Sequence, residues 1–340
     1  MKKGVIIITV IINSLFFNLY AQQNQNVAII GFYNLENLFD TEDDPLKNDE
    51  EFLPNGANQW TDERYQTKLN TLSRVIADMG KDQGGVVVLG VSEIENRRVL
   101  EDLCATKRLS PLNFGVAHHD SPDLRGVDVA FIYRKDRFEF LGEFWYPLIT
   151  ENPRFITRDQ YVIKGVLDKT DTMYFIVNHY PSKRGGEKRS APYRIAAANL
   201  TRHIVDSLYS IDPMAKVIIM GDFNDGPTSK CIVDNLKTIG KTADVKPGCI
   251  FNPMWKMYKN GIGSYPYRDT WELIDQIMLT YALMTKTPNH YHYKSAEVFQ
   301  QSYMVTPTGS YAGYPMRTYA GGVYQAGYSD HFPVLITLQK

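Results

Sequence analysis

The stretch that most constrains the fold lies near the middle of the chain, where the apolar residues 217–220 are followed by Gly221-Asp222-Phe223-Asn224. Four consecutive apolar residues are typical of a strand buried on both faces, as in the sheet of an α/β protein. Ligands gather at the carboxyl ends of such strands. Asp222 and Asn224 are therefore candidate functional residues, although Asp, Asn and Gly are also ordinary turn residues. Polar residues at other strand ends decide between these interpretations.

Other apolar runs also end in polar side chains. Predicted strands over residues 27–33 and 86–91 precede Asn34 and Glu93, and a third predicted strand ends at His179. Glu93 is the strongest of these signals, because Glu is a poor strand residue and is costly to bury without a partner. A histidine at a strand end is more often structural than catalytic, so the residues around His179 decide which role it has.

The C-terminal third adds two acidic residues and a histidine. Asp275 lies inside an apolar run, and Asp330 and His331 are adjacent just before the last predicted strand. A buried carboxylate needs a partner, and a histidine is the usual one in a catalytic pair. By contrast, Glu95 is predicted to be a solvated charge or the start of a short helix.

The remaining pattern predicts alternating strands and helices in one large domain. A helix capped by Thr61 and stopped by Gly80 has apolar positions three and four residues apart. Other expected elements are a surface loop over residues 41–59, a short helix over 96–103, strands over 114–119 and 125–133 (with His118 and His119 at a strand edge), a hairpin over 161–167 and 173–181, a helix over 193–209 and an ordered Tyr/Gly-rich insertion over 303–328.

Cationic residues that suit a phosphate group occur locally. The formal net charge of −1 provides no basic field over the whole protein. Arg125 can reach a phosphate as a planar fork, and Lys183 and Arg184 belong to a basic, glycine-containing segment after His179. A surface arginine and a solvated loop are the alternative interpretations.

The first residues are typical of a secretory signal. Lys2 and Lys3 precede an apolar run over residues 5–17, and a cleavage point after Ala21 is plausible. A membrane anchor is the alternative, but the run is short for a bilayer-spanning helix of about 20 residues. A secreted or periplasmic protein without a stable membrane anchor is therefore expected. The three cysteines, Cys104, Cys231 and Cys249, are interpreted as incidental or buried thiols, although a bridge between the last two is possible.

The collected polar residues favour a hard cation. Carboxylates and carboxamides without a cysteine cluster suit Mg²⁺, or else Mn²⁺ or Ca²⁺, better than zinc. Such a cation beside two histidines suits hydrolysis of a phosphate ester, because the metal takes up oxyanion charge while side chains orient water and transfer a proton. No obvious serine or cysteine nucleophile accompanies the set.

In their order along the chain these residues resemble the endonuclease/exonuclease/phosphatase superfamily, which includes deoxyribonucleases, exonuclease III and bacterial sphingomyelinases. The resemblance rests on Asn34, Glu93, His179, Gly221-Asp222-Phe223-Asn224, Asp275 and Ser329-Asp330-His331. It implies an α/β fold, specifically a four-layer sandwich of two packed mixed sheets flanked by helices, as a single domain over residues 27–340.

The resemblance also implies roles for these residues. Asn34 and Glu93 would hold the metal, with Asp330 near it. Asp222 would activate or orient the water beside Asn224. His331, oriented by Asp275, would act on the scissile phosphate, and His179 would stabilise the phosphoryl oxygens or assist the leaving group.

The expected function is a secreted or periplasmic nuclease, acting as a monomer on nucleic acid or another phosphodiester. The closest alternative is a phosphatase or a phospholipid phosphodiesterase that uses the same centre. A third hypothesis is a protein that binds a phosphate-bearing ligand without catalysis.

Overall fold

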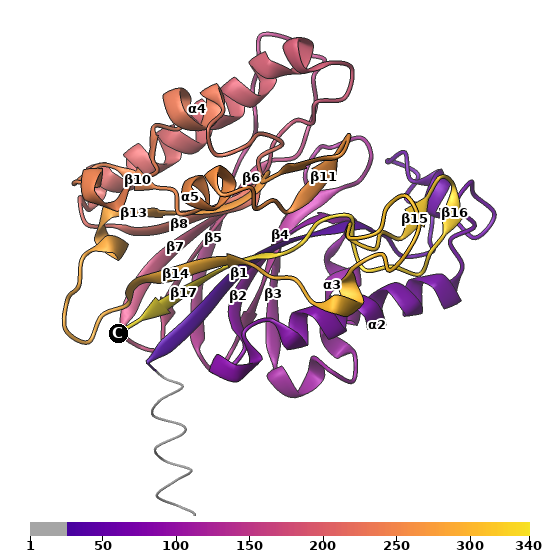
Figure 1. Ribbon diagram of the computed structural model, residues 1–340, viewed down its shortest axis with the longest axis horizontal. Helices are drawn as coiled ribbons and strands as arrows, with labels where there is room; N and C mark the ends of the chain where they lie inside the picture. The colour runs from indigo at the N-terminus through magenta and orange to yellow at the C-terminus, as the bar shows by residue number, and fades with distance from the viewer. Residues whose placement is uncertain (1–25) are drawn as a thin grey trace, which may run out of the picture.

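The computed structural model describes residues 26–340. The predicted signal peptide at residues 1–21 therefore lies outside the described residues. Two large β-sheets of six and seven strands form the centre of the molecule, and helices cover their outer faces (Figure 1). This arrangement confirms the predicted α/β class and the pair of packed mixed sheets.

The first sheet joins the two ends of the described chain. β1 runs parallel to β2 and antiparallel to the last strand, β17. In spatial order the strands are β14 (His292–Val298), β17 (Val334–Gln339), β1 (Val27–Leu38), β2 (Val86–Ile94), β4 (Asp128–Arg134) and β3 (Phe114–His118). Two boundaries correct the sequence prediction: Asn34 lies inside β1 rather than after it, and Arg125 precedes β4 rather than starting it.

The second sheet contains the central apolar stretch. β8 runs parallel to β7 and antiparallel to β13, while β6 and β7 form the predicted hairpin. The spatial order is β5 (Phe138–Tyr146), β6 (Gln160–Leu167), β7 (Asp171–His179), β8 (Lys216–Asp222), β13 (Asp275–Thr280), β10 (Ile250–Phe251) and β9 (Thr238–Ile239).

The two sheets pack face to face through alternating side chains. In β1, Ile30 and Phe32 face the other sheet, whereas Ile29 packs toward the helices on the outer side. In β8, Met220 faces inward and Ile219 packs outward. Because successive strand residues point to opposite faces, each strand supplies both an inner and an outer core.

Helices complete the outer layers. α2 (Asp62–Asp78) and α3 (Arg97–Ala105) cover the first sheet, and α4 (Glu187–Ile211) covers the second (Figure 1). Thr61 caps α2 and Asn96 caps α3, since each side chain accepts a hydrogen bond from a backbone N–H in the first turn. α4 begins six residues earlier than predicted, so the last four residues of the basic segment 182–190 are helical.

The remaining elements are short. They are α5 (Met254–Lys259), the hairpins β11 (Tyr265–Tyr267) with β12 (Thr270–Glu272) and β15 (Tyr319–Ala320) with β16 (Val323–Tyr324), and the helical turns η1 (Glu50–Phe52), η2 (Lys81–Gln83), η3 (Ser110–Leu112), η4 (Cys231–Asn235), η5 (Thr242–Asp244), η6 (Tyr281–Met284) and η7 (Ser302–Met304). All three cysteines are free, as the simpler interpretation expected.

The Tyr/Gly-rich segment 303–328 packs against α2. The guanidinium carbon of Arg74 lies 3.7 Å from the centre of the Tyr303 ring, and that of Arg64 lies 4.5 Å from the Tyr324 ring. These cation–π contacts use several of the tyrosines for packing. The segment also brings its residues 317 and 318 beside Glu36 of β1.

Gly221 gives a testable constraint at the end of β8. A methyl group at this position would lie 2.2 Å from the carbonyl oxygen of Asn178, and the φ angle of 156° is one that L-residues rarely adopt. Gly221→Ala is expected to lower the free energy of unfolding by about 3 kcal/mol, from strain and overpacking. Gly142→Ala is the matched control, because nothing lies within 4 Å of its added methyl. Equal urea-unfolding midpoints for the two variants would contradict this close approach.

Candidate metal-dependent active site

Three of the predicted site residues lie side by side across the second sheet. His179 at the end of β7 is paired in register with Asp222 at the end of β8, and Asp222 is paired with Asp275 at the start of β13. Residues directly opposite one another on neighbouring strands point to the same face. The strand register alone therefore places an imidazole and two carboxylates in one row.

The first sheet brings Asn34 and Glu93 to the same place. Asn34 in β1 is paired with Ser92 in β2, and the Asn34 Nδ2 donates to Asp222 Oδ2 at 3.2 Å. Glu93 sits at an irregularity of the β2–β4 pairing with a φ of 58°. A bulge of this kind re-aims a side chain. As a result, Glu93 Oε1 lies 3.8 Å from His179 Nε2, and Glu93 Oε2 accepts a hydrogen bond from the Asn37 N–H at 3.1 Å.

The segment before β17 supplies Asp330 and His331. The Ser329 hydroxyl donates to the carbonyl of Asn34 at 2.8 Å and accepts from the N–H of His331 at 3.1 Å. This turn fixes the C-terminal segment against β1. The Oδ1 of Asp330 lies 3.8 Å from His331 Nε2.

Asp222 is the centre of the cluster. Its Oδ2 lies 3.2 Å from Asn34 Nδ2, 3.6 Å from His179 Nε2 and 4.0 Å from His331 Nε2. Its Oδ1 accepts the backbone N–H of Asn224 at 2.9 Å. The Asn224 side chain donates to the Tyr180 carbonyl at 2.9 Å, so Asn224 shapes the turn that holds Asp222.

His331 and Asp275 form a buried pair. His331 Nδ1 lies 2.8 Å from Asp275 Oδ2, which also accepts the Ser264 hydroxyl at 2.5 Å. A carboxylate at Nδ1 fixes the tautomer and leaves Nε2 facing the cluster. The Tyr265 ring lies 4.7 Å from the His331 ring and limits its rotation. One ligand atom from each of Asp222, Asp275 and His331 lies within 4.8 Å of the other two.

The two histidines have opposite electrostatic environments. Burial lowers the pKa of His331, but Asp275, Asp330 and Asp222 outweigh it, so its pKa lies well above the ordinary value. Burial lowers the pKa of His179, and the positive charges of Arg158 and Arg125 lower it further. These surroundings therefore favour the charged form of His331 and the neutral form of His179. Paired groups whose pKa values are pushed apart are typical of acid–base sites.

Two carboxyl groups in or beside the cluster have raised pKa values. Burial raises the pKa of Asp222 to about 7, with a contribution from Asp275 that the charge of His331 opposes. Burial and Asp330 likewise raise the pKa of Glu36 to about 7. A divalent cation relieves such crowding, and the oxygen donors of Asn34, Glu93 and Asp330 are the kind that Mg²⁺, Mn²⁺ or Ca²⁺ takes. The donor set therefore fits a hard cation.

Sequence reasoning missed three ionic residues that support the cluster. Lys68 is buried and donates to Thr318 Oγ1 at 2.7 Å, with its Nζ 3.5 Å from Glu36 Oε2. Arg317 donates from Nη2 to Asp330 Oδ2 at 2.5 Å. The position of Lys68 was a usable signal, because it falls on the apolar face of α2, three residues after Tyr65 and four before Leu72.

The three predicted substrate-binding cations have different surroundings. Arg125 is half-exposed, and its charge acts on His179. Lys183 Nζ lies 3.1 Å from Glu272 Oε2, so its charge is partly neutralised. Arg184 is exposed in the turn before α4, where its backbone N–H donates a hydrogen bond to the Ser182 hydroxyl.

Glu95 does not have the predicted solvated environment. Its side chain is buried, and its Oε2 accepts the N–H of Asp40 at 2.7 Å. Burial, with contributions from Asp40 and Asp49, raises its pKa to about 8. The Glu95 side chain therefore links the chain after β2 to the loop that follows β1 by a hydrogen bond, rather than lying in solvent.

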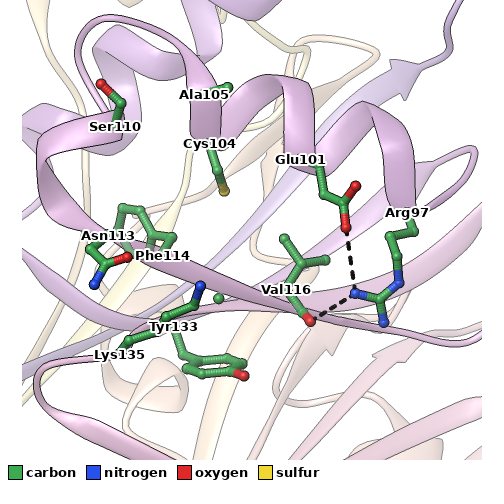
Figure 2. A pocket seen from close by; sticks show the side chains of 11 residues that line it. Arg97, Glu101, Cys104, Ala105, Ser110, Asn113, Phe114, Val116, Tyr133 and Lys135 are labelled. Carbon is green, nitrogen blue, oxygen red and sulfur yellow. Dashed lines mark hydrogen bonds and ion pairs between the residues drawn. The ribbon is translucent and has the colours of Figure 1, made fainter.

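One groove of the protein lies outside the candidate active-site cluster. It has a volume of about 500 Å³ and is formed by α3, the edge strand β3 and η3, with Arg97, Glu101, Cys104, Tyr133 and Lys135 in its lining (Figure 2). The Arg97 Nη1 donates to the Val116 carbonyl on this edge. The carboxylate and histidine cluster is therefore defined by side-chain chemistry rather than by cavity size.

Two packed sheets with carboxylates and histidines gathered at one shared edge define a hydrolase-type α/β sandwich. The chain belongs to the Endonuclease/Exonuclease/phosphatase family, whose model matches residues 29–340. Members of this superfamily are phosphoesterases. A sequence search of curated proteins finds no match.

Several solved structures share the fold. An endonuclease/exonuclease/phosphatase family protein from Bacteroides thetaiotaomicron is 18% identical, with a TM-score of 0.53 over 92% of this chain and 97% of that one. A mannosyl-6-phosphatase from the same organism is 19% identical, with a TM-score of 0.55 over 92% and 100%. D. rerio TDP2, complexed with a single-strand DNA product, is 13% identical, with a TM-score of 0.55 over 92% and 99%. At these identities the likeness establishes the fold.

Proposed function

We propose that this protein is a divalent-metal-dependent phosphodiester hydrolase that acts as a nuclease. The observation that carries the proposal is the position of Asp222 Oδ2, which lies within 4.0 Å of Asn34, His179 and His331 from three other strands or turns. One carboxylate oxygen thus faces a candidate metal ligand and two imidazoles. A purely structural carboxylate does not need this combination.

Each side chain of the cluster has its own proposed role in the reaction. Asn34, Glu93 and Asp330 would hold the cation, which supplies Lewis-acid stabilisation of a phosphoryl oxygen. Asp222, with its pKa near neutrality, orients the attacking water and accepts its proton. His331, held by Asp275, presents a charged Nε2–H to the phosphoryl oxygens as negative charge develops there. His179, a neutral imidazole between Glu93 and Asp222, binds the phosphate or assists the leaving group.

Two exposed tyrosines support nucleic acid as the substrate. Tyr267 on the hairpin next to Tyr265 and Tyr311 in the segment that contains Arg317 are 46% and 61% exposed. Exposed aromatic rings stack bases, and Arg125 and Arg184 supply cations for the backbone. These groups support a substrate longer than a single phosphate ester.

A phosphatase is the second candidate. Two cations near the cluster are already paired, Lys183 with Glu272 and Arg317 with Asp330, which leaves few free charges for a polyanion. One protein of the same fold is described as a mannosyl-6-phosphatase. A small phosphomonoester needs only the cluster itself.

The proposed location is the periplasm or the exterior of the cell, based on the signal-like residues 1–21. Among residues 26–340, no helix has both the length and the apolar character to cross a membrane. We propose a monomer without a stable membrane anchor.

A substrate panel tests the activity and its metal requirement. With Mg²⁺, hydrolysis of plasmid DNA, a single-stranded oligonucleotide and bis-p-nitrophenyl phosphate is expected, and EDTA should abolish it. A preference for p-nitrophenyl phosphate would support the phosphatase instead, and a preference for sphingomyelin a phospholipid diesterase. Inactivity on every substrate would favour a ligand-binding protein and refute the enzymatic proposal.

Glu93→Gln separates metal binding from folding. The amide keeps the size of the side chain and an acceptor for the Asn37 N–H, but it removes the negative charge. The Mg²⁺ concentration for half-maximal activity is expected to rise about tenfold or more. Glu139→Gln, an exposed residue of β5, is the control. An unchanged Mg²⁺ requirement in Glu93→Gln would remove Glu93 from the metal site.

A further inference from the structure

A second cluster of metal-ligand side chains lies at the base of the loop 119–127, which joins β3 to β4. His118 is the last residue of β3, and Asp128 is the first residue of β4. Both are buried, with exposed fractions of 8% and 2%. Asp120, the third member, is open to solvent, which gives an ion a path to the cluster.

The distances between the three side chains suit neighbouring ligands of one metal ion. His118 Nε2 lies 3.0 Å from Asp128 Oδ2 and 3.9 Å from Asp120 Oδ1, and all three atoms lie within 4.8 Å of one another. Two ligands about 2.1 Å from one metal are about 3.0–3.4 Å apart at angles between 90° and 110°. The buried pair, which is joined by a hydrogen bond, already has this spacing, and the exposed Asp120 lies just beyond it.

The other oxygen of Asp128 is already held in place. Asp128 Oδ1 accepts hydrogen bonds from the backbone N–H and the hydroxyl of Ser121. These bonds orient the carboxylate so that Oδ2 faces His118, as supporting hydrogen bonds do around built metal sites.

A further buried carboxylate adjoins the cluster. Asp159 is buried, with an exposed fraction of 6%, and its Oδ1 atom has no hydrogen-bond partner among the described residues. Its Oδ2 lies 3.5 Å from His119 Nε2. Burial raises the pKa of Asp159, His119 lowers it, and the nearby Asp128 raises it. The Asp159 carboxylate therefore acts on Asp128, and His119 partly balances its charge.

We propose that His118, Asp120 and Asp128 form a second cation site that is separate from the catalytic cluster. One imidazole nitrogen with two carboxylates is a donor set for a borderline cation such as Zn²⁺ or Mn²⁺. The ligands proposed for the catalytic metal, Asn34, Glu93 and Asp330, offer oxygen atoms.

The site would stabilise a loop that supports catalysis. Asp123 in this loop accepts from Arg158 Nη1 at 2.9 Å, and Arg158 Nε donates to the His179 carbonyl at 2.9 Å. The backbone N–H of Arg125 also donates a hydrogen bond to Asp123 Oδ1 at 2.9 Å. A cation that closes the base of the loop holds both Arg125 and the backbone of His179 in position.

Zinc stoichiometry tests this proposal. Metal-stripped full-length protein is dialysed against micromolar Zn²⁺, and bound metal per chain is measured by mass spectrometry. Asp120→Asn is expected to remove one equivalent of Zn²⁺, or to weaken it about tenfold or more. Because Asp120 is exposed, this variant should fold normally. Asp82→Asn, in the exposed turn η2, is the control and should retain the wild-type stoichiometry.

The catalytic centre is distinguished with Glu93→Gln. Loss of one equivalent in Asp120→Asn and retention of it in Glu93→Gln supports the second site, even if the phosphoesterase proposal fails. Zn²⁺ should also slow amide exchange of residues 119–127 in the wild type but not in Asp120→Asn. Equal zinc binding and equal exchange in the wild type and Asp120→Asn would overturn the proposal.

Discussion

His331→Ala is expected to lower kcat for bis-p-nitrophenyl phosphate by about two orders of magnitude or more, the usual size of acid–base and electrostatic contributions to catalysis. His331 is the one buried imidazole that Asp275 fixes at 2.8 Å and that neighbouring carboxylates keep charged. Alanine removes the donor that faces the phosphoryl oxygens. Steady-state rates at saturating Mg²⁺ measure the effect.

The control for this variant is His203→Ala. His203 is an exposed histidine of α4, away from the cluster, so its loss should leave kcat within about twofold of the wild type. Circular dichroism and an unfolding midpoint would verify the fold of each variant. A His331→Ala enzyme that turns over at near wild-type rate would show that the centre has been misplaced.

Asp222→Asn is expected to have an effect of similar or larger size. The amide keeps the volume and an oxygen for the Asn224 N–H, but it cannot accept a proton from water. It also removes the negative charge that His331 and His179 face at 4.0 and 3.6 Å. A fall in kcat of about two or more orders of magnitude should follow with little change in stability.

Asp234→Asn, an exposed residue in η4, is the matched control for the loss of one carboxylate. It should not change the rate measurably. If Asp222→Asn were no slower than Asp234→Asn, the role assigned to the carboxylate at the end of β8 would be wrong.

The central strands and the residues that end them were predictable from the sequence. Runs such as residues 217–220 are too apolar to be anything but buried, and Asp222 and Glu93 follow them at fixed positions. The cost of burying a carboxylate predicted a partner for Asp275, and the resemblance to the superfamily identified that partner as His331. These features depend on local composition.

Other features depend on tertiary contacts that no local pattern encodes. The first turn of α4 is polar and exposed, so it shows no apolar period and was interpreted as a loop. Glu95 is buried only because the chain after β1 folds over it. The left-handed backbone of Glu93 depends on the irregular pairing of β2 with β4. Arg317 reaches Asp330 only through the path of the 303–328 segment.

The most direct test of a shared metal centre is anomalous diffraction from crystals soaked in Mn²⁺. The expected result is an anomalous peak within coordination distance, about 2.2 Å, of oxygen atoms of Asn34, Glu93 or Asp330, and its loss in Glu93→Gln crystals. The absence of a peak beside these three residues, in crystals of a protein that is nonetheless active with Mn²⁺, would contradict the proposed centre.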